Sequence, residues 1–501
     1  MPAYVLCALS CNDRLLTRCD VVGQVISIDM LPDHVLLEIF GFYVDQAYDD
    51  EDVDGKKAVE AWQPLVHVCQ CWRSVVFGSP RRLGLQLACT ANTLARDTVD
   101  IWPTTLPLVI CDFECKTGSV GNIIALLGRS DLVRRITQIN LWHVSSSQLD
   151  EISEAMQVPF PELTSLELRN YDEVLLPLSD SFVGGSAPRL RFLLLNRIPY
   201  PGLPKLLLSA THLTKLYLHG IPRSGYISPE AMVACLSTMT GLEGLSLGFD
   251  SCESPRPRSD WESRRSSSLT RILLPVLDLF WFKGVGEYLE HLVARIDAPR
   301  LESLDITFFN DIVFVTPQIT RFIGHTPTLE AFDRARVNLW DETASIELTS
   351  GYARLIMRIS CRELDWQLSF LEQVCTSSLP PVSTLEDLYM SGRPWPQDWK
   401  DTIDYAQWLE LLHSFTAVKN LYLSKELAPC VVPALQDLVG GRTTEVFPNL
   451  QNIFLKELQE SGPVQEGIGK FVATRQVTGH PIAVSRWDRD TDSDNESESD
   501  Y

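Results

Sequence analysis

One pattern of apolar and polar positions dominates the chain from residue 136 onward. The unit is an apolar residue, two variable residues, a second apolar residue, one variable residue and a third apolar residue, as in Leu163, Leu166 and Leu168. It recurs at intervals of 23 to 33 residues. Its twelve copies begin at Ile136, Leu163, Leu190, Leu213, Leu242, Leu269, Leu301, Leu329, Ile356, Leu385, Val418 and Leu450. Alternation of apolar and variable positions is typical of a half-buried strand, so we expect one short strand in each copy.

The segments between these copies carry helix signals. Ser228 offers an N-cap and is followed by Pro229 at the first helical position, and Thr316 with Pro317 repeats this arrangement. Ten of the twelve copies have Pro, Thr or Ser two places before their first apolar residue, which marks the entrance to a strand. The sequence therefore predicts a strand and a helix in each repeat.

This arrangement resembles the leucine-rich repeat family in its longer, irregular form. The resemblance implies an α/β solenoid with a curved parallel sheet, whose leucine ladder is buried only when neighbouring units stack. The Asn or Cys that the family carries after the third apolar position is mostly missing, although Asn170 and Asn196 fit approximately. Arg334 occupies an apolar position of the Leu329 copy, so the repeat boundaries across 329–385 stay open.

A different pattern precedes the repeats. Val35, Leu36, Ile39 and Phe40 have the spacing of one helix face after Leu31-Pro32, and a second amphipathic run follows near residues 65–72. Two short helices cannot cover both apolar faces on each other and be stable alone, so part of this surface should meet a partner.

These residues resemble the F-box, in the version common in mushroom-forming fungi. The resemblance rests on Leu31-Pro32, on the run 35–40 and on Val68, Cys69 and Trp72. It implies docking on a Skp-type adaptor that links to a cullin-RING complex. The residues implied to contact the adaptor are Leu31, Pro32, Val35, Leu36, Ile39, Phe40, Val68 and Cys69. His34 stands where the family usually has an acid, and the alternative is two core helices of a larger domain.

Taken together, the patterns predict six segments. They are an N-terminal tail (1–25), an F-box (26–80) with an acidic insert (45–60), a connector (81–130), a leucine-rich repeat solenoid (131–464), a C-terminal cap (465–485) and a disordered acidic tail (486–501).

Composition narrows the function classes. The 501 residues carry a formal net charge of −22, which repels nucleic acid backbones. No apolar run is long enough to cross a membrane, because 272–282 is interrupted by Pro275 and Asp278. The thirteen cysteines form no CxxC pair, so we expect reduced thiols, no metal and no cofactor. A cytoplasmic or nuclear location fits these features.

One motif imitates a hydrolase. Gly244, Ser246 and Gly248 match the G-x-S-x-G nucleophile elbow, which requires a sharp turn from strand into helix. Leu245 and Leu247 are apolar positions of a repeat, so we expect Ser246 inside a strand and no enzyme activity.

A tryptophan-rich stretch interrupts the later repeats. Trp395 and Trp399 lie beside Pro394 and Pro396. They are either a contact for a target protein, since Trp is frequent at interface hot spots, or a loop pinned to the solenoid.

The expected function is therefore a substrate receptor of an SCF-type ubiquitin ligase, with the F-box on the adaptor and the repeats on an unknown target protein. The alternative is a non-degradative repeat scaffold that binds the adaptor without a cullin.

Overall fold

The computed structural model describes a large part of the chain in two compact units, Met1–Leu190 and Arg191–Tyr501. The described residues are 31–48, 60–80, 82–93, 99–112, 120–172, 175–250, 271–309, 316–361, 363–378, 382–392, 405–436, 438, 444–456 and 462–487. The predicted N-terminal tail, most of the acidic insert, Trp395, Trp399 and the acidic tail beyond Trp487 lie outside these residues.

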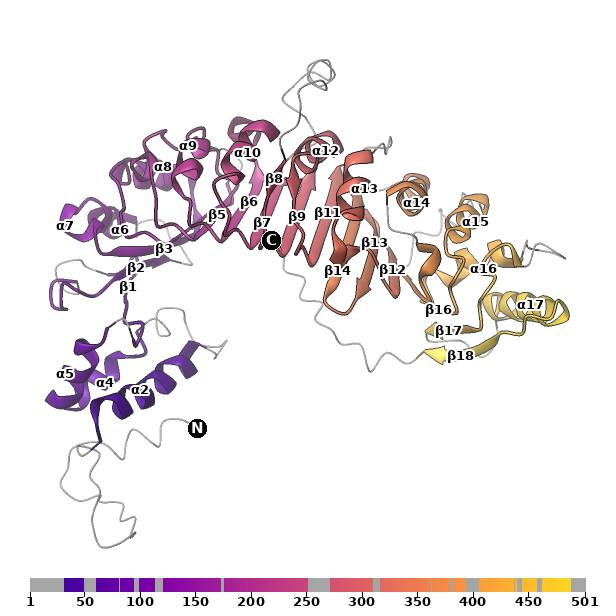
Figure 1. Ribbon diagram of the computed structural model, residues 1–501, viewed down its shortest axis with the longest axis horizontal. Coiled ribbons are helices and arrows are strands. Elements are labelled where there is room, and N and C mark those ends of the chain that lie inside the picture. The colour runs from indigo at the N-terminus through magenta and orange to yellow at the C-terminus, as the bar shows by residue number, and fades with distance from the viewer. Residues whose placement is uncertain are drawn as a thin grey trace, which may run out of the picture. The chain divides into compact units, whose positions relative to one another are not determined.

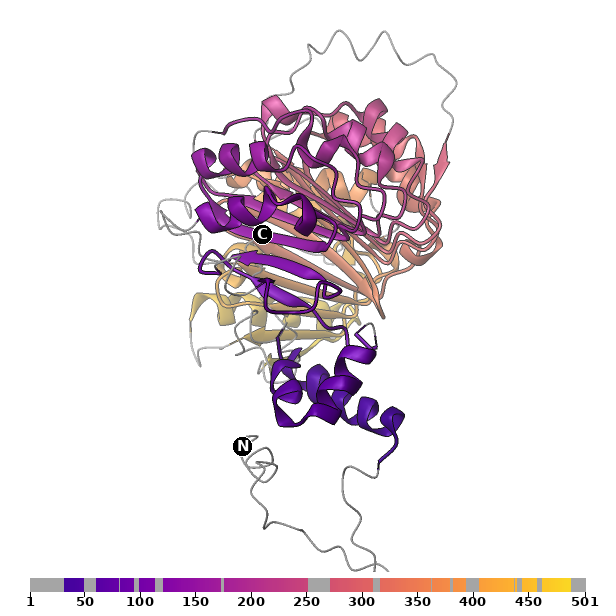
Figure 2. The same cartoon turned by 90° about the vertical axis from the view of Figure 1, so that its left-hand side faces the viewer.

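Three helices form a cluster in the first unit, drawn in indigo in Figures 1 and 2: α2 (Asp33–Tyr48), α4 (Gln63–Val68) and α5 (Gln70–Gly78). We call them the helical cluster. Its core contains Leu36, Phe40, Trp62 and Val76, each 0–1% exposed. The Phe40 ring lies 4.6 Å from the Trp72 ring, which joins α2 to α5.

Contacts of residues 60 and 62 fasten the helical cluster to the first strand of the sheet. The Trp62 indole nitrogen donates to the Gln86 carbonyl at 2.7 Å, and the Ala88 amide donates to the Glu60 carboxylate at 3.1 Å. The Trp62 ring also meets the Trp102 ring edge-on at 5.2 Å. The cluster therefore has its own core but is joined to the repeat sheet of the same unit.

The sheet of the first unit contains parallel strands β1 (Leu87–Cys89), β2 (Leu108–Asp112), β3 (Ile136–Val144) and β4 (Ser165–Asn170). Its helices are α6 (Val120–Leu127), α7 (Ser130–Val133), α8 (Ser146–Ala155) and the 3-10 helix η4 (Phe182–Gly185).

The sheet begins earlier than the sequence indicates, because the 81–130 segment, expected to be a connector, contains β1, β2 and α6. The repeat pattern does not match at β2 because Asp112 pairs with Leu141, the third apolar residue of the Ile136 copy, and so places an acid at that position. Val109 and Cys111 are buried with Ala88 in a separate cluster.

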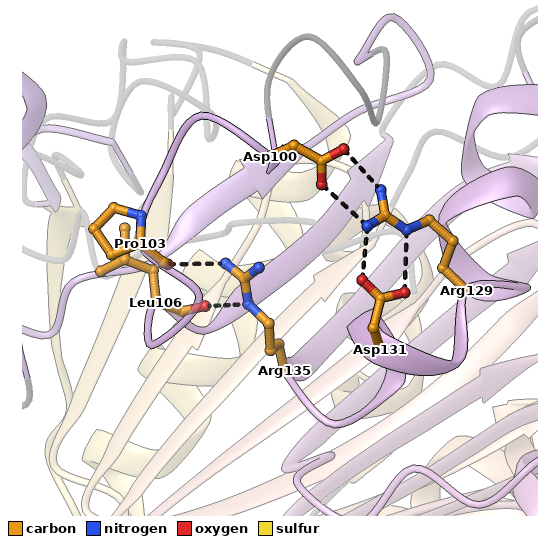
Figure 3. A network of polar contacts seen from close by, with 6 residues as sticks. All are labelled: Asp100, Pro103, Leu106, Arg129, Asp131 and Arg135. Atoms are coloured by element: carbon orange, nitrogen blue, oxygen red, sulfur yellow. Dashed lines mark hydrogen bonds and ion pairs between the residues drawn. The ribbon is translucent and has the colours of Figure 1, made fainter.

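Polar contacts hold the segment after β1 (Figure 3). Arg129 donates to Asp100 at 3.0 and 3.2 Å and to Asp131 at 2.6 and 3.2 Å. Arg135 donates to the carbonyls of Leu106 at 3.0 Å and Pro103 at 3.2 Å. These arginines tie the 99–107 loop to the turn regions around α7.

Strands of the second unit lie in the order β5-β6-β7-β9-β11-β14-β13-β12-β15-β16-β17-β18. Their bounds are β5 (Phe192–Asn196), β6 (Lys215–Ile221), β7 (Gly244–Phe249), β9 (Leu279–Gly284), β11 (Ser303–Phe309), β12 (Arg334–Leu339), β13 (Thr343–Ser350), β14 (Ala353–Ser360), β15 (Asp387–Gly392), β16 (Asn420–Leu423), β17 (Asn452–Lys456) and β18 (Ala483–Trp487). All neighbours are parallel except β12–β13 and β13–β14.

Helices of the second unit follow the strands. They are α9 (Leu203–Ser209), α10 (Pro229–Leu236), α12 (Gly286–Val293), α13 (Pro317–Gly324), α14 (Leu364–Gln373), α15 (Tyr405–His413), α16 (Ala428–Gln436) and α17 (Pro463–Val477), with short helical turns η5 (Arg223–Gly225), η6 (Pro327–Leu329), η7 (Val374–Ser378) and η8 (Val382–Thr384). In Figure 1 helices α9, α10, α12, α13, α14 and α15 lie along the same face of the sheet. The opposite face, which no described helix covers there, is called the open face below.

Strands form where the repeat pattern predicts them in most copies. β4, β5, β6, β7, β11, β15, β16 and β17 each contain the second and third apolar residues of a copy. In β6 and β7 the residues Leu216, Leu218, Leu245 and Leu247 are 0–2% exposed. Burying one leucine side chain stabilises a fold by about 1.5–3 kcal/mol, so the ladder supplies much of the stability of this unit. The mixed α/β fold with a large, mainly parallel sheet agrees with the predicted class.

The Leu269 copy is wrong in position. The strand near it, β8 (Ile272–Leu273), pairs with β10 (Ile296–Asp297) in a separate two-stranded sheet. The main sheet instead uses β9, where buried Leu277, Phe280 and Phe282 repeat the same spacing eight residues later. Because several residues of this run are aromatic, the sequence reads there as one continuous apolar stretch, and the spacing of the repeat was not recognised.

The copies at Leu329 and Ile356 differ most from the expected arrangement. β12, β13 and β14 form an antiparallel meander, so the strand order reverses between β11 and β15. Gly351, with a φ of +58°, occupies the tight turn between β13 and β14. Arg334 is the exposed first residue of β12 and does not fill an apolar position, because Ala335 and Val337 face the core instead.

The helix signals are partly right. The Ser228 hydroxyl caps α10 by accepting from the Ala231 amide at 3.2 Å, with Pro229 at the start. The Thr316 side chain does not cap α13. The Glu290 carboxylate of α12 accepts from the Gln318 and Ile319 amides at 2.8–3.1 Å instead. A cap from a neighbouring repeat leaves no local sequence signal.

At the C-terminal side, the predicted 465–485 cap corresponds mainly to α17 and β18. β18 continues the sheet by pairing in parallel with β17. Among the described residues, no helix is both long and apolar enough to cross a membrane.

Candidate functional site

Helix α2 carries apolar side chains on two faces. Leu36, Phe40 and Val44 point into the helical cluster and are 0–3% exposed. Ile39 and Phe42 lie on the outer face and are 45% and 73% exposed, although both are large and apolar. Val35, one turn before Ile39, is half-buried. Positions 35, 39 and 42 share one side of the helix, so they form an apolar stripe, called the α2 stripe below.

The structure divides the eight residues predicted to contact an adaptor into three groups by exposure. Pro32 and Ile39 are exposed, and Leu31, Val35, Val68 and Cys69 are half-buried at the edge of the helical cluster. Leu36 and Phe40 are 1% and 0% exposed. In this state, these two side chains support the helix from inside and present no surface to a partner.

Cys69 has a local structural role. Its sulfur accepts a hydrogen bond from the Trp72 amide at 3.4 Å, at the N-cap of α5. The residue that sequence reasoning missed is Phe42, the most exposed member of the α2 stripe. Its place seven residues after Val35, on the same helix side, is the signal that could have found it.

Charged and polar residues surround the α2 stripe. Asp33, His34, Glu38 and Asp45 are exposed on the same helix, and Glu38 forms an ion pair with Arg82. An apolar centre with a polar rim is the usual anatomy of a protein-protein interface.

The open face of the second unit carries a second candidate surface. Tyr389, Tyr422 and Phe454 stand in register on β15, β16 and β17, with ring centroids 4.2 and 4.5 Å apart and nearly parallel planes. Trp487 of β18 meets Tyr389 and Tyr422 edge-on at 5.8 and 5.5 Å. We call these four residues the aromatic ladder.

Polar side chains run beside the aromatic ladder. The Asn452 side-chain amide donates to the Asn420 side-chain carbonyl at 2.8 Å. The Asn420 side-chain amide donates to the Asp387 carboxylate at 2.7 Å. Burial raises the pKa of Tyr389, and the neighbouring Tyr422 raises it further. The Tyr389 hydroxyl therefore stays a neutral hydrogen-bond donor at ordinary pH. This edge of the open face is ordered by its own contacts and offers flat rings and amides to a ligand.

Ser246 lies inside β7, as the sequence predicts. Its hydroxyl is 2.6 Å from the His219 Nε2 of β6, a pairing that the sequence does not reveal because the residues are 27 positions apart. The His219 ring also lies 5.3 Å from the Trp281 ring on the same face. The position in a strand does not match a nucleophile elbow, which needs a strand-to-helix turn.

No cluster of three or more metal-ligating side chains occurs in the part of the chain that the structure describes. The two candidate surfaces are built from apolar, aromatic and charged side chains.

Comparisons with known proteins add little. No protein-family model matches the sequence, and no curated protein matches it. Among solved structures, the leucine-rich repeat-containing protein LegL7 from Legionella pneumophila is similar over 67% of this chain and 90% of its own, with 13% identity and a TM-score of 0.25. A likeness of this degree carries no argument about this chain.

Proposed function

We propose that the protein is the substrate receptor of an SCF-type ubiquitin ligase. The helical cluster would bind a Skp-type adaptor, and the leucine-rich repeats would hold a target protein. The observation that carries the proposal is the α2 stripe: an exposed Ile39 and Phe42 on a helix whose opposite face is fully packed. Large apolar side chains at such a site lose water when a partner covers them, which favours binding.

The proposed receptor does no chemistry itself. It would bring lysines of the target close to a charged ubiquitin carrier, and the gain in local concentration would raise the transfer rate. The proposal therefore requires two independent surfaces, one for the adaptor and one for the target. The α2 stripe and the open face belong to different units of the chain, which supports such a division.

Adaptor capture tests the first half of the proposal. The full chain with Ile39→Ala and Phe42→Ala should capture a Skp-type adaptor at least about tenfold less well, corresponding to about 1.4 kcal/mol. The control is Leu208→Ala on α9, which removes a large apolar side chain of 49% exposure from the second unit. Equal capture by both variants, with unchanged circular dichroism, would rule out the α2 stripe as the docking site.

Cullin co-purification separates the ligase from a scaffold. A receptor that promotes degradation should co-purify with a cullin as well as the adaptor, and targets captured by the repeats should persist longer in cells that express the Ile39→Ala, Phe42→Ala variant. Adaptor without cullin, and equal target half-lives, would replace the ligase with the non-degradative scaffold.

A further inference from the structure

The charge of the open face is opposite to that of the whole chain. The chain has a formal net charge of −22, but the side chains on the open face of the second unit include more bases than acids. Strand register and alternate burial assign to this face the bases Lys215, Lys283, Arg334, Arg336, Arg354, Arg358 and Lys456 and the acids Asp305, Glu347 and Asp387. An acidic protein thus presents a basic surface along its sheet.

Part of this positive charge is already neutralised. Arg358 donates two bonds to Asp305, at 2.5 and 2.7 Å, and Arg354 donates to Glu347 at 2.6 Å. Arg334 and Arg336 of β12 form no ion pair with any described carboxylate. We call these two arginines the β12 pair.

The β12 pair adjoins the aromatic ladder. The Arg336 guanidinium lies 5.9 Å from the Tyr389 ring, and Tyr389 lies 5.8 Å from Trp487. β12 and β15 are neighbouring strands, with Arg336 directly opposite Tyr389. Trp487 is the last residue of β18, so the chain leaves the described structure beside the aromatic ladder.

The segment that follows Trp487 is complementary in charge and spacing. Seven acids occupy every second position from Asp488 to Asp500, interleaved with Arg489 and small polar residues. An extended chain places alternate residues on one side, about 6.5 to 7 Å apart. All seven carboxylates can then face one surface, and the fourteen residues can extend about 46 Å. Crossing from β18, which ends at Trp487, to β12 needs four strand spacings, about 19 Å, and reaching β14 needs six, about 29 Å.

We propose that residues 488–501 dock on the open face, with their carboxylates against the β12 pair and the neighbouring bases. The covalent link at Trp487 makes this docking intramolecular, equivalent to a millimolar concentration of free segment. The docked segment would occupy the basic surface and compete with any other acidic ligand there. This inference does not depend on the adaptor or on the proposed ligase function.

A peptide competition experiment tests the docking. The probe is a fluorescent peptide of residues 488–501. It is added to the full chain in which the tail is neutralised by Asp488→Asn, Asp490→Asn, Asp492→Asn, Asp494→Asn, Glu496→Gln, Glu498→Gln and Asp500→Asn. Anisotropy should show binding that weakens as salt rises, because screening reduces attraction between exposed charges. The unaltered chain should bind the peptide at least about tenfold more weakly, since its own tail occupies the site.

Charge reversal locates the site. Arg334→Glu with Arg336→Glu, made in the tail-neutralised chain, should weaken peptide binding at least about tenfold. The control, Lys205→Glu on α9 with Arg321→Glu on α13, changes the net charge equally at exposed positions of two helices and should leave binding within about twofold. If charge reversal unfolds the sheet, the milder double variant Arg334→Gln with Arg336→Gln provides the same test.

Three results would overturn the inference. They are no binding of the peptide to the tail-neutralised chain, equal loss of binding in the β12 and control variants, or equal binding by the unaltered and tail-neutralised chains. The last result would mean that the open face accepts acidic peptides but is not occupied by its own tail.

Discussion

The strand ladder of the second unit and helix α2 of the first both have closely spaced apolar residues, and they differ in how these residues are covered. Leu216 and Leu245 of the ladder are completely buried, because each repeat is covered by the next. In α2, Phe40 is buried but Phe42 is 73% exposed. A repeat array provides its own cover for every unit, whereas a small helical cluster has more apolar surface than its core can bury.

Placing a charge in the buried leucine ladder should have the largest effect on stability. Leu216→Asp places a charge at a fully buried position with no partner, and the cost of burying it is prohibitive. We expect loss of soluble protein or a large fall in the thermal midpoint. Leu208→Asp, eight residues earlier at a half-exposed position on α9, should melt close to the unaltered protein. Similar melting of both variants would show that the ladder is not the core of this unit.

Two phenylalanines of α2 allow buried and exposed apolar side chains to be compared within the helical cluster. Phe40→Ala removes a ring packed on Trp72 and should destabilise the cluster by about 3–5 kcal/mol. Phe42→Ala removes an exposed ring and should have little effect on stability. Hydrogen exchange of peptides from α2 and α5 measures the local opening free energy without assuming two-state unfolding of the whole chain. Equal protection in both variants would contradict the assignment of the two faces.

Much of the fold was predictable because burial sets the apolar period. The strands β6, β7, β11 and β15 lie where their copies place them. The reversal at β12–β14 was not predictable, since the same alternation suits parallel and antiparallel strands. Only the turn geometry at Gly351 and the short connection from β12 to β13 decide the direction.

The candidate surfaces were predictable only in part. A helical pattern marks apolar positions, but the packing of Trp72 against Phe40 decides which face is covered. The aromatic ladder has a sequence signal that lies outside the three apolar positions of the repeat unit. Tyr389, Tyr422 and Phe454 occupy the variable position between the last two apolar residues of consecutive copies. Their stacking depends on the strand register, which one sequence does not contain.

The start of α2 offers a smaller perturbation. Leu31→Ala with Pro32→Ala changes a half-buried and an exposed residue beside the α2 stripe. We expect adaptor capture to fall about tenfold while α2 keeps its hydrogen-exchange protection. A pull-down with the folded double variant measures this. Unchanged capture would remove the Leu31-Pro32 start from the proposed interface, and lost protection would place these residues among the structural ones.

The smallest effect should come from the polar network in Figure 3, which adds exposed ion pairs to a 99–107 loop whose Val99 and Leu106 are already buried. Arg129→Met removes the bonds to Asp100 and Asp131, and exposed ion pairs of this kind contribute about 0–1 kcal/mol. Hydrogen bonding to Arg129 lowers the pKa of Asp131 below its ordinary 3.8. A carboxyl group with a lowered pKa in the folded state stabilises the fold above its unfolded pKa, and this contribution is lost as the pH falls through the folded value.

The difference between Arg129→Met and the unaltered protein should therefore be constant near pH 7 and should shrink below pH 3.8. Thermal midpoints at several pH values measure it, and exchange of the 99–107 peptide locates it. The control is Arg189→Met, which removes another exposed ion pair of the first unit, with Glu162, and leaves the loop untouched. If Arg129→Met costs as much as Phe40→Ala, polar contacts stabilise this unit as strongly as apolar burial, and the contrast between the two regions would not hold.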